Sequence, residues 1–372
     1  MSERIERYDT KLERLKKWSE GNPKGPVSIH LDTTNRCNLE CKFCWQRSHE
    51  RKGWINYEDE LSEEKLLSLV KEADELGVEH WLISGGGGPL LRTETTIKVM
   101  EEIKRRGMHG DIITNGTFFD EEHIKRLVDA GWDRVRFSIN GPKAEVHDFI
   151  VGREGTFSEA ITSLKLFEKY KKKFGKDKPE IGFNTVINSE NWNKIDQIMQ
   201  LLAELNGQLM NVQTIILYSE KEEEWTLNES QKKKLPKYIK KANRIASKNG
   251  IDTNVDQYLD KSLVDKSNKM DEMDDVIEQE RKKISRGEGF GSAYCYEPWY
   301  LVTIRADGTV GSCRLFGDEG VDIHDRSLRD IWFGEYYQKN REKLLGGEPL
   351  EFCSKCGSNE FLQNKKIREE LR

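Results

Sequence analysis

The chain has 372 residues, with 61 Lys and Arg against 66 Asp and Glu, which gives a formal net charge of −5. This balance excludes a general electrostatic affinity for nucleic acid or for an anionic membrane surface. No apolar run is long enough to span a bilayer, and the N-terminal residues lack the apolar core of a secretory signal. We therefore expect a cytoplasmic protein with no membrane and no nucleic-acid partner.

Strand-like and helix-like patterns alternate along the first 217 residues. After a short charged helix at the N-terminus, the first strand covers Val27–Thr33 and runs directly into a cysteine-rich loop. Five more strands are predicted at 81–83, 111–114, 134–139, 181–187 and 212–217, with helices at 62–76, 95–106, 120–130, 158–173 and 192–205. Strands separated by helices with short connections predict a parallel sheet with right-handed crossovers.

The notable motifs all follow predicted strands. The cysteine loop, the run Gly85–Pro89, Asn115-Gly116 and Asn140-Gly141 each come directly after a strand. In barrel enzymes the functional groups collect at the C-terminal ends of the strands. The sequence therefore predicts one site, built from several strand ends.

The remaining chain divides by composition. A charged, mostly helical stretch includes one helix over Asn228–Lys248, bent or broken near Pro236, and a polar segment over 252–286 that reads as an insertion or a lid. Beyond it, two strands separated by Asp307-Gly308 predict a hairpin, with a helix near 328–345. We expect four parts: a helical extension, a barrel, a charged linker or insertion, and a small C-terminal domain, over residues 1–26, 27–220, 221–291 and 292–372.

The seven cysteines fall into two groups, with none between Cys44 and Cys295. An odd count in a reducing compartment argues against a complete set of disulfides. Three thiolates in the first group would leave one iron of a four-iron cluster without a protein ligand, open to a small chelating molecule. Four thiolates in the second group would ligate a second cluster fully. The two groups are Cys37, Cys41 and Cys44, and then Cys295, Cys313, Cys353 and Cys356.

Zinc is the alternative for both groups. A zinc knuckle in the first group would need a histidine, His30 or His49, as its fourth ligand. A four-cysteine zinc ribbon in the second group is the stronger alternative, because Cys353-x2-Cys356 is a common zinc half-site. Under this interpretation the protein is a non-enzymatic interaction module that contains zinc and no iron.

The string CNLECKFC resembles the cluster-binding loop of radical S-adenosylmethionine (SAM) enzymes, in which an aromatic residue, here Phe43, precedes the third cysteine. The C-terminal layout is similar to the twitch domain, the shortened form of the SPASM domain, with Gly308-x4-Cys313 followed by a Cys-x2-Cys pair. The resemblance covers roughly residues 27–218 and 292–358. It implies an α/β fold, a partial (β/α)6 TIM-type barrel with a small C-terminal domain of a β-hairpin and helices.

The resemblance also implies the cofactors: two 4Fe-4S clusters and SAM, which chelates the open iron of the first cluster. In such enzymes the reduced cluster cleaves SAM to methionine and a 5′-deoxyadenosyl radical, which abstracts a hydrogen atom from the substrate. A low-potential electron donor such as flavodoxin or ferredoxin is then expected. The four C-terminal cysteines would hold the second, auxiliary cluster.

Several further residues match the family's SAM-binding positions. Gly85, Gly86, Gly87 and Gly88 occupy the place of the family's Gly-Gly-Glu-Pro loop, where relatives carry Glu at the position of Gly88. Ser138, in the string SING, resembles the hydroxyl that contacts the carboxylate or the ribose of SAM. The alternative for the glycine run is a merely flexible turn.

Four further residues have a structural interpretation as well as a functional one. Arg153 looks like the family's carboxylate-binding arginine, and a surface salt bridge is the alternative. Asn115 is expected either at the ribose or simply in its own turn. Asn184 and Thr185, in the fifth strand, are likewise open between a functional and a structural interpretation. We expect His147 to be a solvated histidine in a polar loop, and Tyr296 and Trp299 to pack in the core around the second cluster.

Three reaction classes remain open besides the zinc module. The twitch spacing resembles that of the aminocyclitol dehydrogenase of antibiotic biosynthesis, which implies oxidation of a small hydroxylated substrate, a sugar or an aminocyclitol, with the auxiliary cluster as electron acceptor. The alternative is modification of a peptide or protein, or a redox-neutral epimerase or dehydratase. We expect a small-molecule substrate and an oxidoreductase. The catalytic residues on the substrate side are not identified by the sequence.

Overall fold

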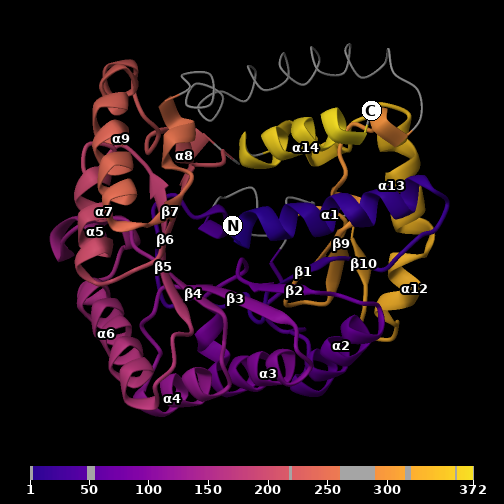
Figure 1. The fold of residues 1–372 in the computed structure, drawn as a ribbon, viewed down its shortest axis with the longest axis horizontal. Coiled ribbons are helices and arrows are strands. Elements are labelled where there is room, and N and C mark those ends of the chain that lie inside the picture. The colour runs from indigo at the N-terminus through magenta and orange to yellow at the C-terminus, as the bar shows by residue number, and fades with distance from the viewer. Residues whose placement is uncertain are drawn as a thin grey trace.

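The computed structural model of the chain describes residues 3–47, 55–217, 220–259, 290–314, 320–356 and 358–371. These residues build one ten-stranded sheet in the order β10-β9-β8-β1-β2-β3-β4-β5-β6-β7. Figure 1 shows the strands curving around a centre with helices outside them. Strands β10 and β7 lie at the two ends of the sheet and do not pair with each other, so the barrel is open on one side.

Seven strands run parallel and follow each other in chain order across the sheet. The helices between them cover the outer face, as expected for right-handed crossovers. This is the predicted partial barrel. The strands are β1 Ser28–Leu31, β2 His80–Ile83, β3 His109–Thr114, β4 Arg134–Ser138, β5 Glu180–Ile187, β6 Leu209–Thr214 and β7 Asp252–Thr253.

The covering helices begin where the sequence places their caps. Ser62 accepts a hydrogen bond from the N–H of Lys65 at 3.1 Å, and Asp120 accepts one from the N–H of His123 at 2.8 Å. Asn228 forms a capping box with Gln231. The helices are α2 Glu63–Glu75, α3 Thr93–Arg105, α4 Glu121–Asp129, α5 Ala144–Val151, α6 Thr156–Phe174, α7 Ile195–Glu204 and α9 Glu229–Asn249.

The C-terminal part extends the same sheet. Strand β8 pairs in parallel with β1, with Leu301 opposite Ser28 and Ile304 opposite Leu31. The predicted hairpin is present, because β8 and β9 pair antiparallel around Asp307-Gly308. The sequence did not predict the parallel pairing that joins this hairpin to the barrel. The elements are β8 Leu301–Ile304, β9 Thr309–Gly311, β10 Val321–Asp322, α12 Leu328–Trp332, α13 Glu335–Leu345 and α14 Ser358–Leu371.

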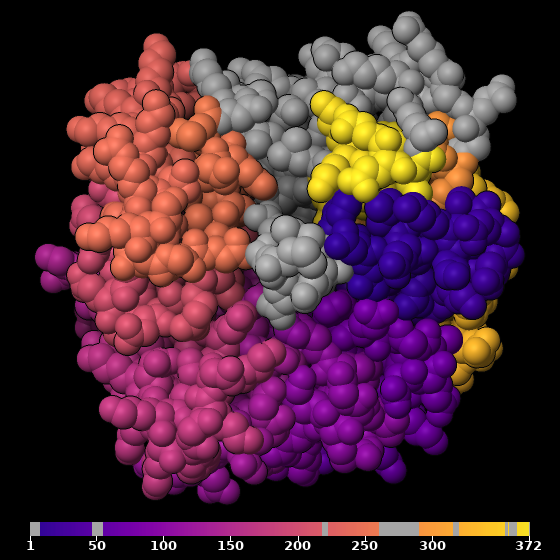
Figure 2. Space-filling view, in the orientation of Figure 1, coloured from indigo at the N-terminus to yellow at the C-terminus, as the bar shows by residue number. Residues whose placement is uncertain are grey.

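The two terminal helices lie side by side. Figure 2 shows the N-terminal helix α1, Glu3–Ser19, in indigo against α14 in yellow. The Tyr8 hydroxyl donates to Glu370 at 2.9 Å, and the Lys11 ammonium donates to Gln363 at 3.2 Å. The N-terminal helix is therefore packed on the C-terminal part of the molecule.

Several element boundaries differ from the sequence prediction. The sixth strand begins three residues earlier than predicted, and α5 was missed. Helix α9 is continuous through Pro236, so it is not broken there, while the helix predicted at 328–345 is interrupted near Gly334. Most of the polar segment at 252–286 lies outside the described residues. Within the described residues, no helix is both long and apolar enough to cross a bilayer.

Candidate functional site

The first cysteine group lies in a loop that continues from the C-terminal end of β1. The loop is held against the end of α5 by two backbone hydrogen bonds, from Glu40 to the carbonyl of Val151 at 3.0 Å and from Lys42 to that of Ile150 at 3.1 Å. The N–H of Cys44 donates to the carbonyl of Cys41 at 3.0 Å, which closes a tight turn. No disulfide joins any of the seven cysteines, all of which lie within the described residues.

The glycine run packs directly on the residues that lead into this loop. The N–H of Gly87 donates to the carbonyl of Thr34, and that of Gly88 to the carbonyl of Arg36, both at 2.8 Å. Gly85 and Gly86 have φ of +83° and +40°, which side chains rarely adopt. A Cβ at Gly87 would overlap the carbonyl of Arg36. The glycine run therefore packs tightly against the residues before the cysteine loop, and it is not merely a flexible turn.

Asn115 links the end of β3 to the cysteine loop. Its amide nitrogen donates to Asn38 at 2.9 Å, and Asn38 in turn donates to the hydroxyl of Thr117 at 3.0 Å. The Asn115 side-chain oxygen accepts from the N–H of Thr117 at 3.1 Å, so this residue also holds its own turn. Asn38 lies inside the motif CNLECKFC, but the sequence did not predict its role.

Glu60 and Arg92, also missed by the sequence, anchor the segment before Cys37. Glu60 accepts from the hydroxyl of Thr34 at 2.7 Å and from the N–H of Asn35 at 2.8 Å. Arg92 donates to the carbonyls of Thr33 and Leu61 at 3.0 and 2.8 Å. Both residues contact the loop from elements distant in sequence, and no local pattern marks either of them.

Asp32 is a buried carboxyl under the glycine run. The pKa of Asp32 is raised from 3.8 to about 7, mainly by burial, and nearby Asp307 also raises it. Arg305 and a hydrogen bond from the N–H of Gly86 act in the opposite direction. Asp307 and Arg305 belong to the C-terminal hairpin, so this carboxyl lies where the barrel and the C-terminal part meet.

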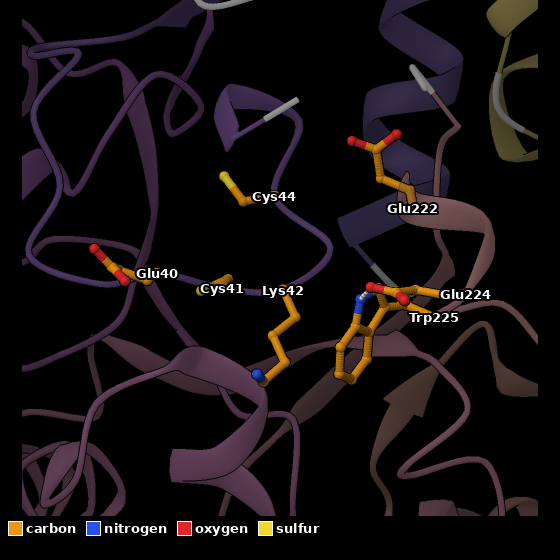
Figure 3. A pocket seen from close by; sticks show the side chains of 7 residues that line it. All are labelled: Glu40, Cys41, Lys42, Cys44, Glu222, Glu224 and Trp225. Atoms are coloured by element: carbon orange, nitrogen blue, oxygen red, sulfur yellow. Dashed lines mark hydrogen bonds between the residues drawn. The ribbon is translucent and has the colours of Figure 1, made fainter. Parts of the chain in front are cut away.

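A cavity of about 320 Å³ opens beside the cysteine loop. Figure 3 shows its lining from two segments, the loop itself and the residues around α8 (Glu220–Glu223), with Cys41 and Cys44 on one side and Trp225 on the other. The ammonium group of Lys42 lies 4.7 Å from the ring centre of Phe149 and 5.1 Å from that of Trp225. These contacts fasten the loop to both neighbouring segments. The lining residues are Glu40, Cys41, Lys42, Cys44, Glu222, Glu224 and Trp225.

Phe43 lies against an apolar wall near this cavity. It packs with Trp225 on a small cluster of buried side chains from the end of β5 and from the residues after β6, namely Val186, Ile215 and Leu217. Ile215 and Leu217 were predicted to continue the sixth strand. They lie beyond its end instead, where they build this wall. In the sequence Trp225 stands out only as an aromatic residue in a charged stretch, which does not indicate its place in this wall.

Ser138 ends β4 beside Asn184 of β5, and among the described residues no hydrogen bond engages its hydroxyl. Asn184 accepts from Asn211 at 2.8 Å. Thr185 faces the other side of the strand, and its hydroxyl donates to the carbonyl of Ile139 at 2.7 Å. Ser138 therefore remains available at the barrel interior, Asn184 is bonded to Asn211, and Thr185 has a structural role.

The prediction for His147 was wrong, because this side chain is fully buried in α5 rather than solvated in a loop. Its Nδ1 accepts a hydrogen bond from the N–H of Asn140 at 3.1 Å. Burial lowers the pKa of His147 to about 4, with a small opposing effect of Asp148. The apolar residues of α5 around it continue a helical pattern that the flanking Pro142 and Gly152 obscure in the sequence.

Arg153 forms a two-pronged ion pair with Glu159, with N–O distances of 2.8 and 2.7 Å. Both side chains are more than a third exposed. In this arrangement Arg153 takes the predicted alternative of a surface salt bridge. It follows α5, whose end contacts the cysteine loop, so a role in binding a carboxylate stays a prediction.

The second cysteine group lies in the C-terminal part. The Cys295 sulfur accepts from the N–H of Glu297 at 3.5 Å, and the Cys353 sulfur accepts from the N–H of Leu350 at 3.3 Å. Burial raises the pKa of the Cys295 thiol well above its usual range, Glu297 and Cys353 raise it further, and Arg368 lowers it. Tyr294 is close enough that Cys295, Cys353 and Cys356 all raise its pKa, although burial has the largest effect.

The surroundings of this group are mostly aromatic. Tyr296 and Trp299 are buried in the apolar cluster of the C-terminal part, as predicted. Cys313 follows β9 and lies close enough to Tyr336 and Tyr337 to raise the pKa of each, although burial has the largest effect on both. Buried aromatic side chains thus surround this cysteine group. The described residues form no group of three or more His, Cys, Asp or Glu side chains spaced to hold a metal ion.

Three thiols at the end of the first barrel strand and four more in an appended domain define a class of iron–sulfur proteins with an open barrel. A family model described as the radical SAM superfamily matches residues 31–202, and one for the SPASM iron–sulfur cluster-binding domain matches residues 295–357. The chain belongs to the radical SAM superfamily and carries a SPASM-type domain. It therefore binds SAM, a 4Fe-4S cluster in the barrel and a further iron–sulfur cluster in the C-terminal domain.

Two curated relatives match about half of this chain. The tungsten-containing aldehyde ferredoxin oxidoreductase cofactor-modifying protein of Pyrococcus furiosus is 27% identical over 190 residues, which is 50% of this chain and 51% of that protein. The Fe-coproporphyrin III synthase of Methanosarcina barkeri is 31% identical over 181 residues, which is 49% of this chain and 42% of that protein. The matched region thus spans about half the length of these relatives.

Solved structures share the fold over most of the chain. The crystal structure of Streptococcus suis SuiB bound to SAM has a TM-score of 0.63 at 14% identity and covers 88% of this chain and 71% of that chain. Native anSMEcpe with bound SAM has a TM-score of 0.59 at 17% identity and covers 93% of this chain and 96% of that chain. At these identities the likeness shows the fold alone.

Proposed function

We propose that this protein oxidises a small hydroxylated molecule, such as a sugar or an aminocyclitol, by abstracting a hydrogen atom and passing one electron to the auxiliary cluster. The observation that carries the proposal is the chemistry of the barrel interior. When bound, SAM and the reduced first cluster supply the radical that removes the hydrogen atom. The side chains of the protein bind and orient the substrate.

The two faces of the barrel strands differ in composition. Along β4, Val135 and Phe137 are fully buried against the helices, whereas Arg134, Arg136 and Ser138 alternate with them and face inward. Closed barrels fill their interior with branched apolar side chains. On β4 the inward positions are polar, which suits a chamber that holds a polar ligand.

The charges in this chamber are largely paired. Asp111 of β3 lies 2.6 Å from Arg136, and Arg134 donates to Glu180 of β5 at 2.8 Å. Because these charges are paired, the interior presents hydrogen-bonding groups rather than a net charge. Such groups lie in register on three neighbouring strands, at Ser138, Asn184 and Asn211. A lining of hydroxyl and amide groups suits a substrate with several hydroxyl or amino groups.

The cysteine groups support the oxidative half of the proposal. A carbon that bears a hydroxyl group and has lost a hydrogen atom reaches the carbonyl level by releasing one electron and one proton. The C-terminal domain offers four thiols, so no iron of its cluster need bind the substrate, and such clusters span a wide range of reduction potentials. The parallel pairing of β8 with β1 fixes this domain to the strand that leads into the first cluster loop.

Peptide modification is the alternative. Solved structures of this fold include SuiB bound to a precursor peptide and anSMEcpe bound to a Cp18Cys peptide. The curated relatives are named for modification of a cofactor and for synthesis of Fe-coproporphyrin III, neither of which is a peptide, and this favours a small molecule. We further propose a cytoplasmic location, a low-potential donor such as flavodoxin or ferredoxin, and the four-part domain division given above.

The test removes the auxiliary ligands only. We expect anaerobically reconstituted wild type to bind about eight irons per chain, and the Cys353→Ala/Cys356→Ala variant about four. Incubated with SAM, dithionite and a panel of aminocyclitols and sugars, the variant should still form 5′-deoxyadenosine but no oxidised product. Its matched control, Cys37→Ala/Cys41→Ala/Cys44→Ala, should keep about four irons and form no 5′-deoxyadenosine.

Three results would contradict the proposal. Full product formation by the Cys353→Ala/Cys356→Ala variant would exclude the electron-relay role. Deuterium transfer from a labelled peptide, but from none of the polyols, would favour the peptide alternative. Stoichiometric zinc without iron in anaerobically purified wild-type protein would support a non-enzymatic zinc-binding module instead.

A further inference from the structure

The C-terminal helix α14 connects the two halves of the auxiliary ligand set. It begins at Ser358, two residues after Cys356, so it is joined covalently to the Cys353–Cys356 pair. The matched iron–sulfur domain ends at residue 357, so it assigns nothing to this helix. Yet α14 runs back across the domain and contacts the segment that carries Cys295.

Asn364 and Arg368 make these contacts on both sides of Cys295. Asn364 accepts a hydrogen bond from the N–H of Tyr296 at 2.7 Å. Arg368 donates from one guanidinium nitrogen to the carbonyls of Ala293 and Tyr294 at 2.9 and 2.8 Å. The backbone is therefore held immediately before and immediately after the cysteine.

Both side chains are buried, and the helix is supported from behind. Asn364 is 4% exposed and Arg368 is 5% exposed. They lie four residues apart, on one face of the helix, with the fully buried Ile367 beside them. On another side α14 contacts α1 through Gln363 and Glu370, so the helix cannot move freely away from Cys295.

A buried arginine in this place has an electrostatic consequence as well as a packing role. Moving a cation out of water is costly unless nearby negative charge compensates it. The guanidinium donates to the carbonyls of the two residues directly before Cys295, so its charge is held beside that cysteine. A cluster held by four thiolates carries a net negative charge, which a cation fixed beside one of the ligands stabilises.

We propose that Asn364 and Arg368 are positioning residues for the auxiliary cluster, which hold Cys295 at a fixed place relative to Cys353 and Cys356, and that the Arg368 charge raises the cluster's reduction potential. Net charge and hydrogen bonding around the cluster are the properties by which a protein adjusts that potential. The inference rests on the proposed assignment of these cysteines, which the iron content of the wild type tests separately.

The experiment compares four variants of the full-length holoprotein: Arg368→Gln, Arg368→Lys, Asn364→Ala and, as control, Lys365→Gln. Lys365 lies on the same helix but is exposed, so its replacement removes one positive charge without touching the Cys295 segment. Each protein is titrated potentiometrically by electron paramagnetic resonance, with and without SAM. SAM changes only the signal of the first cluster, so the unchanged signal belongs to the auxiliary cluster. Iron release to a chelator is followed in parallel.

Arg368→Gln should lower the potential of the auxiliary cluster and speed iron release several-fold, while Lys365→Gln matches the wild type. Arg368→Lys should keep the potential closer to the wild type than Arg368→Gln does, and Asn364→Ala should speed iron release with little change in potential. Equal potentials and equal iron release in Arg368→Gln and Lys365→Gln would overturn the proposal. If Arg368→Gln does not fold, wild-type iron release in both Asn364→Ala and Arg368→Lys would overturn it.

Discussion

Gly88 donates its backbone N–H to the carbonyl oxygen of Arg36 at 2.8 Å, which joins the end of the glycine run to the residue directly before Cys37. The same contact brings Gly87 so close to Arg36 that a side chain has no room there. At Gly88 itself a Cβ would meet its nearest neighbours at 3.5 Å, an ordinary van der Waals distance. Adjacent glycines thus have different constraints.

We expect Gly87→Ala to disrupt the first cluster and Gly88→Ala to preserve it. The methyl group at position 87 must push the backbone of the cysteine loop away, whereas the one at position 88 fits. Iron content and SAM-cleavage rate of the two reconstituted variants provide the measurement. A Gly87→Ala protein with full iron and wild-type cleavage would show that the loop does not depend on this packing.

We expect the cavity beside the cysteine loop to hold part of SAM. Trp225→Ala should then weaken SAM binding by about tenfold, since the ring lines this cavity and contributes a cation–π contact to Lys42. Trp225→Phe should retain most of the affinity because it keeps an aromatic face. The dissociation constant of SAM, measured by the change in the spectrum of the first cluster, decides between these outcomes. Phe174→Ala, at the far end of α6, is the matched aromatic control and should bind like the wild type; equal affinity in Trp225→Ala would refute the role.

Arg153→Ala should weaken SAM binding more than Arg153→Lys does. A lost charge-assisted hydrogen bond costs roughly 1.5–3 kcal/mol, or about tenfold to a hundredfold in affinity. The ion pair with Glu159 is more than a third exposed, so releasing the arginine from it costs little. Glu159→Gln frees the arginine and should bind SAM at least as tightly as the wild type. Unchanged SAM affinity in Arg153→Ala would show that Arg153 forms a surface salt bridge and does not bind the carboxylate of SAM.

His147→Gln should reduce the loss of stability on acidification. The pKa of His147 is about 4 in the folded protein against 6.5 ordinarily, so between these values the unfolded state binds more protons. Wild-type stability therefore falls as the pH drops from 6.5 toward 4, and this contribution is absent in the variant. Melting temperatures of both proteins at about pH 7.5 and about pH 5, on either side of the ordinary histidine pKa, test this. The wild type should have the higher melting temperature at the higher pH. A difference in melting temperature between the two proteins that stays the same at the lower pH would contradict the burial of a neutral imidazole.

The elements that the sequence predicted well are those with strong local signals. Ser62 and Asp120 each mark a helix start because a short polar side chain accepts from the N–H three residues later. Helix α5 was missed because Pro142 and Gly152 bound a segment of only eight residues. His147 was consequently predicted to be solvated, although its environment depends on contacts of α5 with Asn140, after β4, and with Phe157 of α6.

The sequence alone determined the chemistry of this protein: the number and spacing of the thiols, the glycine run and the alternation of strands and helices are all local patterns. Only the tertiary structure decided how these parts are held. Contacts between distant segments place Glu60, Arg92, Trp225, Asn364 and Arg368, and the parallel pairing of β8 with β1 sets Ser28 opposite Leu301. Such contacts leave no periodic or local trace, because the geometry that creates them exists only after the chain has folded.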